Sequence, residues 1–509
     1  MFPAGFEFPR TLWPGAARAA YSRGMTLSRE FLDELRTICA DGDLLTSPEA
    51  CAPFECDALT AHRHAPELVM LPRDADAVRA ALRVSAAHGV PVVARGAGTG
   101  LSGGALPVPG GMLLVLARLN RILEVDPERR LARVEPGVTN LAISQAAAPH
   151  KLFYAPDPSS QIACSIGGNV AENSGGVHCL KYGLTLHNLL EVELVTVAGE
   201  TIVLGSEAGE SAGLDLLALA CGSEGMLGVV TAVTVRLTPL PERIELLLAG
   251  FDDVAGCADA VGQIIASGLL PAGLEMMDAP AIRAAEAFAH CGYPIDAAAL
   301  LLCELDGCAE DVEDAVARTR AVLDSCGATS VRLATDPDER ARMWSGRKAA
   351  FPAVGRLAPD YYCMDGTIPR RHLADVLARI TAMSNQYGLP VANVFHAGDG
   401  NLHPLIMFDA GDPAQLAAAE RFGAEILELC VSVGGTVTGE HGVGVEKLGP
   451  MCSQFGELEL ETFHAVKRAF DPAGLLNPGK AIPTLARCAD YGAMRVHGGK
   501  LPFPHLPRF

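Results

Sequence analysis

Two histidines and a Glu-His pair in the second half of the chain have side chains that could carry chemistry. His396 and His403 are seven residues apart and bracket the turn AGDGN, while Glu440 and His441 stand in a second Gly-rich turn, GEHGVG. A reversing turn can bring two imidazoles to one cation, and neutral imidazoles with a carboxylate suit a divalent transition metal. Two histidines at this spacing alone are more often hydrogen-bonded loop residues. The nearby Glu440 favours a metal site of two nitrogens and one oxygen with an open position.

An arginine could supply the positive charge that an anionic substrate needs. The formal net charge of the chain is -20, which repels small anions, anionic lipid headgroups and nucleic acid, so we expect no nucleic-acid partner. An enzyme that acts on an anion therefore needs a local fork of cationic donors. Arg347, in the sequence WSGRK, is the candidate. The other interpretation of Arg347 is a solvated arginine on a helix surface.

Three Gly-rich segments in the first half are typical of loops that approach a phosphorylated ligand closely. Arg95–Gly104 (RGAGTGLSGG) follows an apolar run, and its backbone N–H groups can converge on a pyrophosphate. Pro156–Gly176 is a long, polar, unstructured segment, which is more often functional than not inside a compact domain. Gly222–Gly225 is the third. Each segment alone is weak evidence, because Gly-rich turns are more often structural and GxGxxG is matched only loosely.

The composition fits an α/β or α+β enzyme with reduced thiols. The 509 residues, of which 49% are hydrophobic, suggest about two to four domains. The 15 cysteines form no CxxC pair, which indicates neither a disulfide framework nor an iron–sulfur ligand run. The first residues lack the apolar run of a signal peptide, and no stretch of about 18 apolar residues predicts a transmembrane helix. Met25 is an alternative start to Met1.

Regular elements must position the Gly-rich loops. We expect a helix over Asp74–His88, ended by Gly89, between strands around Leu68–Leu71 and Val90–Val93. Further strands are expected at Met112–Leu116, Arg121–Val125, Leu131–Val134, Glu191–Val197, Thr201–Leu204 and Met226–Leu237, with a hairpin at Ala198-Gly199-Glu200.

The second half alternates helices with short apolar strands. Pro239 and Pro241 indicate the boundary between the halves. Helices are expected at Arg371–Tyr387 and Pro413–Val433, both followed by glycine. Each His-containing turn should follow a strand, and for the second turn this strand is Gly435–Thr438.

The ordered Gly-rich blocks, together with VEPGV at Val134–Val138, resemble the FAD-binding domain of the vanillyl-alcohol oxidase / p-cresol methylhydroxylase superfamily. The expected fold class is therefore α+β: a two-subdomain FAD-binding domain and an α+β cap (substrate) domain with a mixed or antiparallel sheet. The first loop contains no histidine and Cys164 lacks the cysteinyl-flavin context, so non-covalent FAD is expected, with Cys164 as a packed small residue. The resemblance implies FAD contacts from Arg95, Gly96, Ala97, Gly98, Thr99, Gly100, Pro136, Gly137, Pro156, Asp157, Ser160, Gly167, Gly168, Asn169, Asn173, Gly175, Gly176, Glu224, Gly228 and Val229.

The blocks HAGDGNLHP and GEHGVG resemble the C-terminal domain of FAD-linked 2-hydroxy-acid dehydrogenases. The resemblance implies that His396, His403 and Glu440 bind a divalent metal, zinc or manganese, and that His441 is the general base. It implies that Arg347 grips the substrate carboxylate. In the segment FDPAGLLNPGK, the resemblance makes Asn477 a further flavin contact.

Three segments are similar to the flavin-subunit family of bacterial glycolate oxidases. They are YAPDPSSQIACSIGGNVAENSGGVHCLKYGLT, DYYCMDGTIPRR and the tail CADYGAMRVHGGKLPFPHLPRF. The similarity implies oxidation of glycolate to glyoxylate. It also implies a second flavin subunit and an iron–sulfur subunit as partners, quinone as the indirect acceptor, and a cytoplasmic chain peripheral to the inner membrane. Cys363 departs from hydroxyglutarate-type relatives, which carry lysine near this position, and this argues against a second substrate carboxylate.

Two alternatives remain: a D-lactate dehydrogenase of the same family, and a flavin-binding assembly subunit with little activity of its own. The complete set of histidines, glutamate and arginine argues against the second alternative. The expected domains are an N-terminal segment (1–54), the FAD-binding domain (55–241), the substrate domain (242–475) and a segment returning to the FAD domain (476–509).

Overall fold

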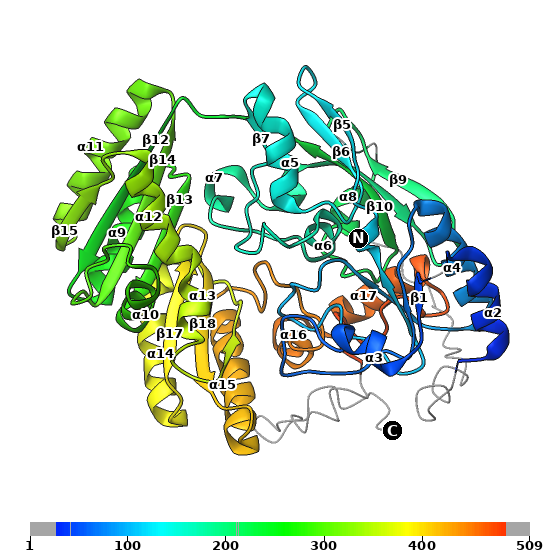
Figure 1. Cartoon of the computed structure of the whole chain (residues 1–509). Helices are drawn as coiled ribbons and strands as arrows, with labels where there is room; N and C mark the ends of the chain where they lie inside the picture. Colours follow the sequence, from blue (N-terminus) through cyan, green and yellow to red (C-terminus); the bar gives the residue numbers. More distant parts are fainter. Residues whose placement is uncertain (1–26, 41, 210, 212, 485–509) are drawn as a thin grey trace, which may run out of the picture.

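The computed structural model describes residues 27–40, 42–209, 211 and 213–484, and its first half contains two main sheets (Figure 1). One sheet has the spatial order β1 (Leu44–Leu45), β2 (Val69–Met70), β4 (Met112–Val115) and β3 (Val92–Arg95), in which β2, β4 and β3 run parallel. Helices α2 (Arg29–Ile38) and α4 (Ala75–His88) share its core. The expected helix is confirmed, because Asp74 caps the N-terminus of α4 and Gly89 ends it at a φ of +66°.

The other sheet of the first half is antiparallel. Its spatial order is β5 (Ile122–Asp126), β6 (Leu131–Val134), β10 (Val229–Arg236), β8 (Leu189–Val195) and β9 (Thr201–Gly205), and β8 and β9 form the expected hairpin. Helices α5 (Asn140–Ala147), α6 (Ile166–Glu172) and α8 (Leu216–Ala220) share its core. The prediction that Pro156–Gly176 is unstructured is wrong, because α6 lies within it. Ser165 caps α6 by accepting the Gly168 N–H.

The second half is built on one seven-stranded sheet. Its spatial order is β15 (Ala328–Leu333), β12 (Arg243–Phe251), β14 (Ala299–Gly307), β13 (Gly273–Asp278), β17 (Val391–His396), β18 (Asn401–Phe408) and β16 (Asp360–Cys363). Every pairing in it is antiparallel, so the open choice between a mixed and an antiparallel sheet is settled.

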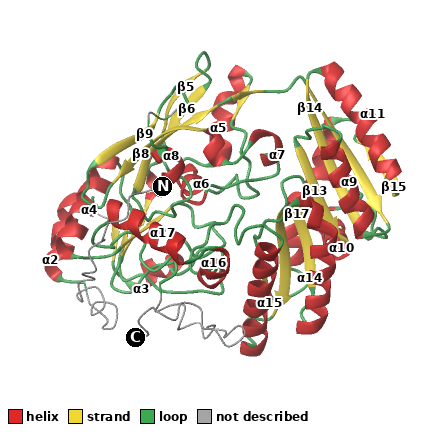
Figure 2. Ribbon diagram, turned by 180° about the vertical axis from the view of Figure 1, so that it is seen from behind, coloured by secondary structure: helices red, strands yellow, loops and turns green. Residues whose placement is uncertain are grey.

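Helices cover both faces of this sheet (Figure 2), which explains why its strands are apolar on both sides. One face shares a core with α9 (Val254–Ala266), α11 (Ala309–Ser325), α14 (Leu373–Tyr387) and α15 (Pro413–Ser432). The other face shares a core with α10 (Ala279–Ala289), α12 (Pro337–Lys348) and α13 (Ala350–Val354). The expected helices at the positions of α14 and α15 are confirmed to within two residues at each end.

The chain crosses between the halves and comes back. Strand β11 (Thr238–Pro239) still pairs with β7 (Leu152–Phe153) in the first half, whereas β12 belongs to the second. After α16 (Leu448–Gln454) and α17 (Glu457–Phe470), Leu476 forms a bridge with Val92 in β3. Met25 and the tail beyond residue 484 lie outside the described residues.

Two further expectations concern the whole chain. Among the described residues, all cysteines carry free thiols, which agrees with the prediction of reduced thiols. No described helix has the length and apolar character needed to cross a membrane.

Candidate active site

The β17–β18 pair places the two histidines side by side. In the register of this pair, His396 lies opposite Asn401 and His403 lies opposite Val394. Because side chains alternate across a strand, both histidines point from the same face. Their ring centroids are 5.1 Å apart and the rings are nearly perpendicular. The reversing turn inferred from the sequence therefore does bring the imidazoles together.

Glu440 completes a ligand set with these histidines. Its Oε1 lies 3.0 Å from His403 Nε2 and 3.4 Å from His396 Nε2. One ligand atom from each residue lies within 4.8 Å of the others. The imidazoles hold the pKa of Glu440 well below its usual value, although burial alone would raise it. An ionised carboxylate and two imidazoles fit a divalent transition metal.

A buried ion pair holds the turn that carries Glu440 and His441. Asp365 accepts the backbone N–H groups of Gly439, Glu440 and His441, and Lys447 donates to its Oδ2 at 2.9 Å. Both side chains of the pair are completely buried. The strand expected at 435–438 is wrong, because this segment makes only an isolated bridge through Thr436 to Thr367. Asp365, not a neighbouring strand, fixes the turn.

His441 lies beside the ligand set as a neutral imidazole. Its ring stacks on that of His403 at a centroid distance of 4.9 Å, and its Nε2 lies 3.8 Å from Glu440 Oε1. Burial, assisted by His403, lowers the pKa of His441 to about 4, although Asp365 opposes the shift. A neutral ring has a lone pair ready to accept a proton. This is the state that a general base requires.

Arg347 is buried, so the interpretation of a solvated surface arginine is wrong. It lies on α12, and its side chain is 1% exposed, as is that of Glu275. Arg347 Nε donates to Glu275 Oε2 at 2.7 Å, and Glu275 Oε1 lies 2.8 Å from His396 Nδ1. The register places Glu275 of β13 directly opposite His396. One carboxylate therefore joins the arginine to a candidate metal ligand.

The Gly-rich loops of the first half form a crowded polar cradle. Gly98, in the loop after β3, has a φ of +74°, and a side chain at Gly137 would lie 2.6 Å from the Leu116 carbonyl. Buried polar atoms that lack a hydrogen-bond partner surround the loop: Asp57 Oδ2, Ser102 Oγ, Glu172 Oε2 and Asn477 Oδ1. Close backbone approach and unsatisfied polar atoms fit a polar ligand such as FAD.

The cradle is joined directly to the turn that carries Glu440 and His441. Glu224 accepts the N–H groups of Val443 and Gly444, each at 2.7 Å. A side chain at Gly175 would come 2.6 Å from Glu440 Oε2. The segment with the expected flavin contacts therefore passes beside the ligand set.

Three other residues expected to contact flavin, Asn477, Pro156 and Asn169, take part in hydrogen bonds that link the Gly-rich loops. Asn477 donates to the carbonyl groups of Gly104 and Glu224, which joins the returning segment to the first and third Gly-rich loops. Asn140 donates to the Pro156 carbonyl and to Asn169, which links the second loop to α5. Direct flavin contacts remain predictions for all the expected residues: Arg95, Gly96, Ala97, Gly98, Thr99, Gly100, Pro136, Gly137, Pro156, Asp157, Ser160, Gly167, Gly168, Asn169, Asn173, Gly175, Gly176, Glu224, Gly228, Val229 and Asn477.

A clasp of charged side chains also joins the halves. His178 lies between two carboxylates, with Nδ1 2.8 Å from Asp157 and Nε2 2.9 Å from Glu304. Trp344 of α12 donates to the other oxygen of Glu304 at 2.6 Å. The clasp thus ties the second Gly-rich segment to the helix that carries Arg347.

Sequence reasoning missed Glu275, Asp365, Lys447, His178 and Glu304. The sequence signal that could have indicated a buried functional carboxylate is a single charged residue inside an apolar run, as Glu275 is in GLEMMD.

Known proteins support the same arrangement. Residues 66–205 match the family described as "FAD binding domain", and residues 240–481 match "FAD linked oxidases, C-terminal domain". Over 467 residues the chain is 63% identical to "Glycolate oxidase subunit GlcD" of Escherichia coli (strain K12), covering 92% of this chain and 94% of that protein. It is 30% identical to "D-lactate dehydrogenase" of Anaerostipes hadrus, covering 89% of this chain and 97% of that protein.

A solved structure shares the fold at low sequence identity. The structure of p-cresol methylhydroxylase with substrate bound matches with a TM-score of 0.76 and 16% identity, covering 90% of this chain and 98% of that one. The fold expected from the Gly-rich blocks is confirmed.

Proposed function

Because the chain belongs to the FAD-linked oxidases, we propose that it oxidises a small 2-hydroxy acid to the 2-oxo acid, with glycolate as the preferred substrate. The chain is an FAD-dependent oxidoreductase. One observation carries the choice of substrate class: a buried arginine, a neutral histidine and a metal-type ligand set converge beside the Gly-rich loops. A 2-hydroxy acid offers its carboxylate to the arginine, its hydroxyl oxygen to the metal and its hydroxyl proton to the histidine.

Arg347 orients the substrate in this proposal. Because Glu275 takes its Nε–H, the terminal nitrogens of the guanidinium remain to bind the substrate carboxylate. His396, His403 and Glu440 would hold the metal, and a bound divalent ion supplies Lewis-acid polarisation of the substrate hydroxyl.

His441 moves the proton. It accepts the hydroxyl proton at Nε2, the ring nitrogen closest to Glu440. Bound FAD supplies the acceptor for the hydride that leaves the substrate Cα. Burial of the His441 side chain, which is 13% exposed, lowers its pKa and keeps the ring neutral until the proton arrives.

We further propose that the chain works as one subunit of a larger enzyme. The E. coli relative is named as a subunit, and this supports the proposal. The expected partners are a second flavin subunit and an iron–sulfur subunit, which carry electrons towards quinone. Association with these partners would hold the chain at the cytoplasmic side of the inner membrane.

Anaerobic flavin bleaching tests the substrate. The purified holoprotein is mixed with glycolate, D-lactate or D-2-hydroxyglutarate, and loss of flavin absorbance is followed by stopped flow. Of the three acids, glycolate should give the highest ratio of the bleaching rate constant to the dissociation constant of the acid. Faster bleaching by D-lactate would favour the D-lactate dehydrogenase that the A. hadrus relative suggests. A flavin that none of the three acids bleaches would refute the proposal and support an assembly subunit.

Metal removal tests the ligand set separately. Exhaustive chelation should abolish glycolate-dependent bleaching without releasing the flavin, and one equivalent of Zn²⁺ or Mn²⁺ should restore it. Metal content is measured in parallel by mass spectrometry. Chelation that strips the metal but leaves the bleaching rate unchanged would refute a catalytic metal.

A further inference from the structure

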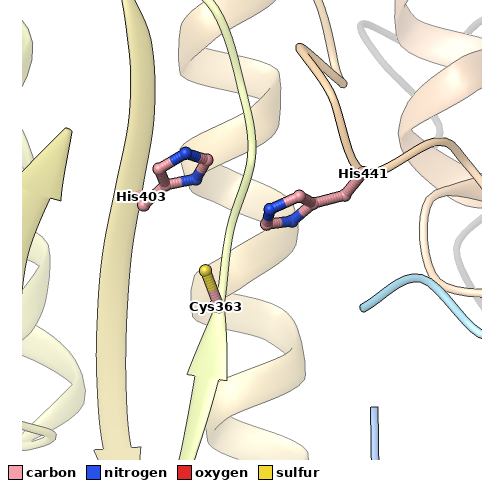
Figure 3. Close-up of side chains that lie close together, drawn as sticks. All are labelled: Cys363, His403 and His441. Carbon is pink, nitrogen blue, oxygen red and sulfur yellow. The ribbon is translucent and has the colours of Figure 1, made fainter. Parts of the chain in front are cut away.

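A second set of possible metal ligands overlaps the candidate active site. It consists of Cys363, His403 and His441, whose ligand atoms all lie within 4.8 Å of one another. Figure 3 shows the Cys363 side chain pointing towards the space between the two imidazole rings. His403 belongs to both this set and the set with His396 and Glu440. The two sets differ in that one offers a carboxylate oxygen and the other a sulfur.

The sheet register fixes the sulfur in this place. Strand β16 pairs with β18, and Cys363 lies opposite Leu405, two residues beyond His403 on the same face. Cys363 Sγ and His403 Nδ1 each lie 3.4 Å from the carbonyl oxygen of Met364. The thiol is 4% exposed. Its position is therefore built by strand pairing and is not that of a thiol on a mobile loop.

The set can close on a tetrahedral ion with small side-chain movements. Bond lengths of about 2.3 Å to sulfur and about 2.0 Å to nitrogen separate the ligand atoms of such an ion by about 3.3–3.6 Å. The present spread of up to 4.8 Å needs at most about 1.2–1.5 Å of closure, which rotation of Cys363 and His441 can supply. Burial raises the pKa of the Cys363 thiol well above its usual value; the carboxylates of Asp365, Glu446 and Glu440 add to this shift, and Lys447 opposes it.

We propose that Cys363, His403 and His441 form an inhibitory site for a thiophilic divalent ion such as Zn²⁺ or Cd²⁺. Soft thiolate ligands select zinc-like ions. The set with Glu440 has no sulfur, so it suits a harder ion such as Mn²⁺ as well as it suits Zn²⁺. Binding replaces the thiol proton: the S–H bond breaks, a sulfur–metal bond forms, and one proton passes to solvent. No electrons are transferred.

Inhibition follows from the loss of the His441 lone pair. An imidazole nitrogen that is bonded to a metal cannot accept the substrate proton. This step rests on the proposed function, in which His441 is the base. The inference assigns different effects to the two ligand sets: a divalent ion held by His396, His403 and Glu440 supports turnover, and a thiophilic ion held through Cys363 suppresses it.

Cadmium titration of the holoprotein tests the site by spectroscopy. Cd²⁺–thiolate bonds absorb in the ultraviolet, so the wild type is compared with Cys363→Ser and with Cys308→Ser, which removes an exposed thiol instead. The wild type and Cys308→Ser should share a tight phase that Cys363→Ser lacks. An identical tight phase in all three proteins overturns the proposal.

Inhibition is then measured on the Mn²⁺-loaded proteins. Each variant is titrated with Zn²⁺ and compared with its own rate without Zn²⁺. Cys363→Ser should need at least about tenfold more Zn²⁺, because even the loss of an outer-shell partner weakens metal sites about 10–100-fold. Equal Zn²⁺ sensitivity of all variants overturns the proposal and leaves the proposed function intact. A Cys363-dependent cadmium band without Zn²⁺ inhibition overturns the inhibitory role and leaves the proposed function intact.

Discussion

Replacing Glu275 with glutamine gives the sharpest test of how the site is held together. Both oxygens of Glu275 are acceptors: Oε2 accepts from Arg347 Nε at 2.7 Å, and Oε1 lies 2.8 Å from His396 Nδ1. A glutamine has the same shape but only one acceptor oxygen. If that oxygen stays with Arg347, the amide NH₂ faces His396. His396 must then turn Nδ1 into an acceptor and carry its proton on Nε2, the nitrogen that faces Glu440.

The magnitude follows from burial. Arg347 and Glu275 are each 1% exposed, and removing one partner from such a buried pair costs about 3–5 kcal/mol. The free energy of unfolding of Glu275→Gln should fall by this amount. A protonated Nε2 cannot bind a metal, so metal affinity should fall at least about 10–100-fold, the usual effect of losing the outer-shell partner of a metal-ligating histidine.

The assay combines chemical denaturation with metal titration of the apoprotein. Glu245→Gln is the matched control, since Glu245 lies in the same sheet but pairs with Arg243, which is 41% exposed. The control should lose about 0–1 kcal/mol and keep its metal affinity. If Glu275→Gln kept wild-type metal affinity and lost no more stability than the control, the coupling of Arg347 to His396 through one carboxylate would be wrong.

Three other changes test separate parts of the site. His441→Asn should lower kcat about 10²–10⁴-fold while metal content and flavin absorbance stay unchanged; near-native turnover would remove His441 as the base. Arg347→Lys should raise KM for glycolate about 10–100-fold, since a bidentate charge-assisted contact is lost, and an unchanged KM would place the carboxylate elsewhere. His178→Gln should flatten the pH dependence of stability. Burial lowers the pKa of His178, but Asp157 and Glu304 outweigh it and raise that pKa well above its usual value. The clasp therefore stabilises fully below about pH 6.5 and weakens as pH rises through the raised pKa, a trend measured by denaturation at several pH values. Equal slopes for both proteins would contradict this.

Local signals explain what the sequence could predict. Asp74 and Gly89 bound α4 through contacts within a few residues, and the β8–β9 hairpin closes over a short turn. The two histidines could be paired in advance because one turn separates them. In each case the chemistry lies close together in the chain, so composition and spacing were enough.

Long-range pairing explains what was missed. Glu275 lies 72 residues from Arg347 and 121 from His396, and only the β13–β17 register brings them together. Asp365 holds a turn 74 or more residues away. The strand expected at 435–438 failed for the same reason, because an apolar run forms a strand only where a partner strand is available, and Thr367 offers a single bridge.

The two hydrogen bonds from Val443 and Gly444 to Glu224 also set the order in which the molecule can mature. They span 219 and 220 residues, and contacts of such sequence separation form late because long loops must close first. During synthesis, the Gly-rich loops leave the ribosome well before the GEHGVG turn exists. A growing chain can therefore form its three Gly-rich loops before the turn with His441 exists, and Asn477 joins the cradle later still. We expect the capacity to oxidise substrate to arise at the last stage of folding, when the turn docks on Glu224.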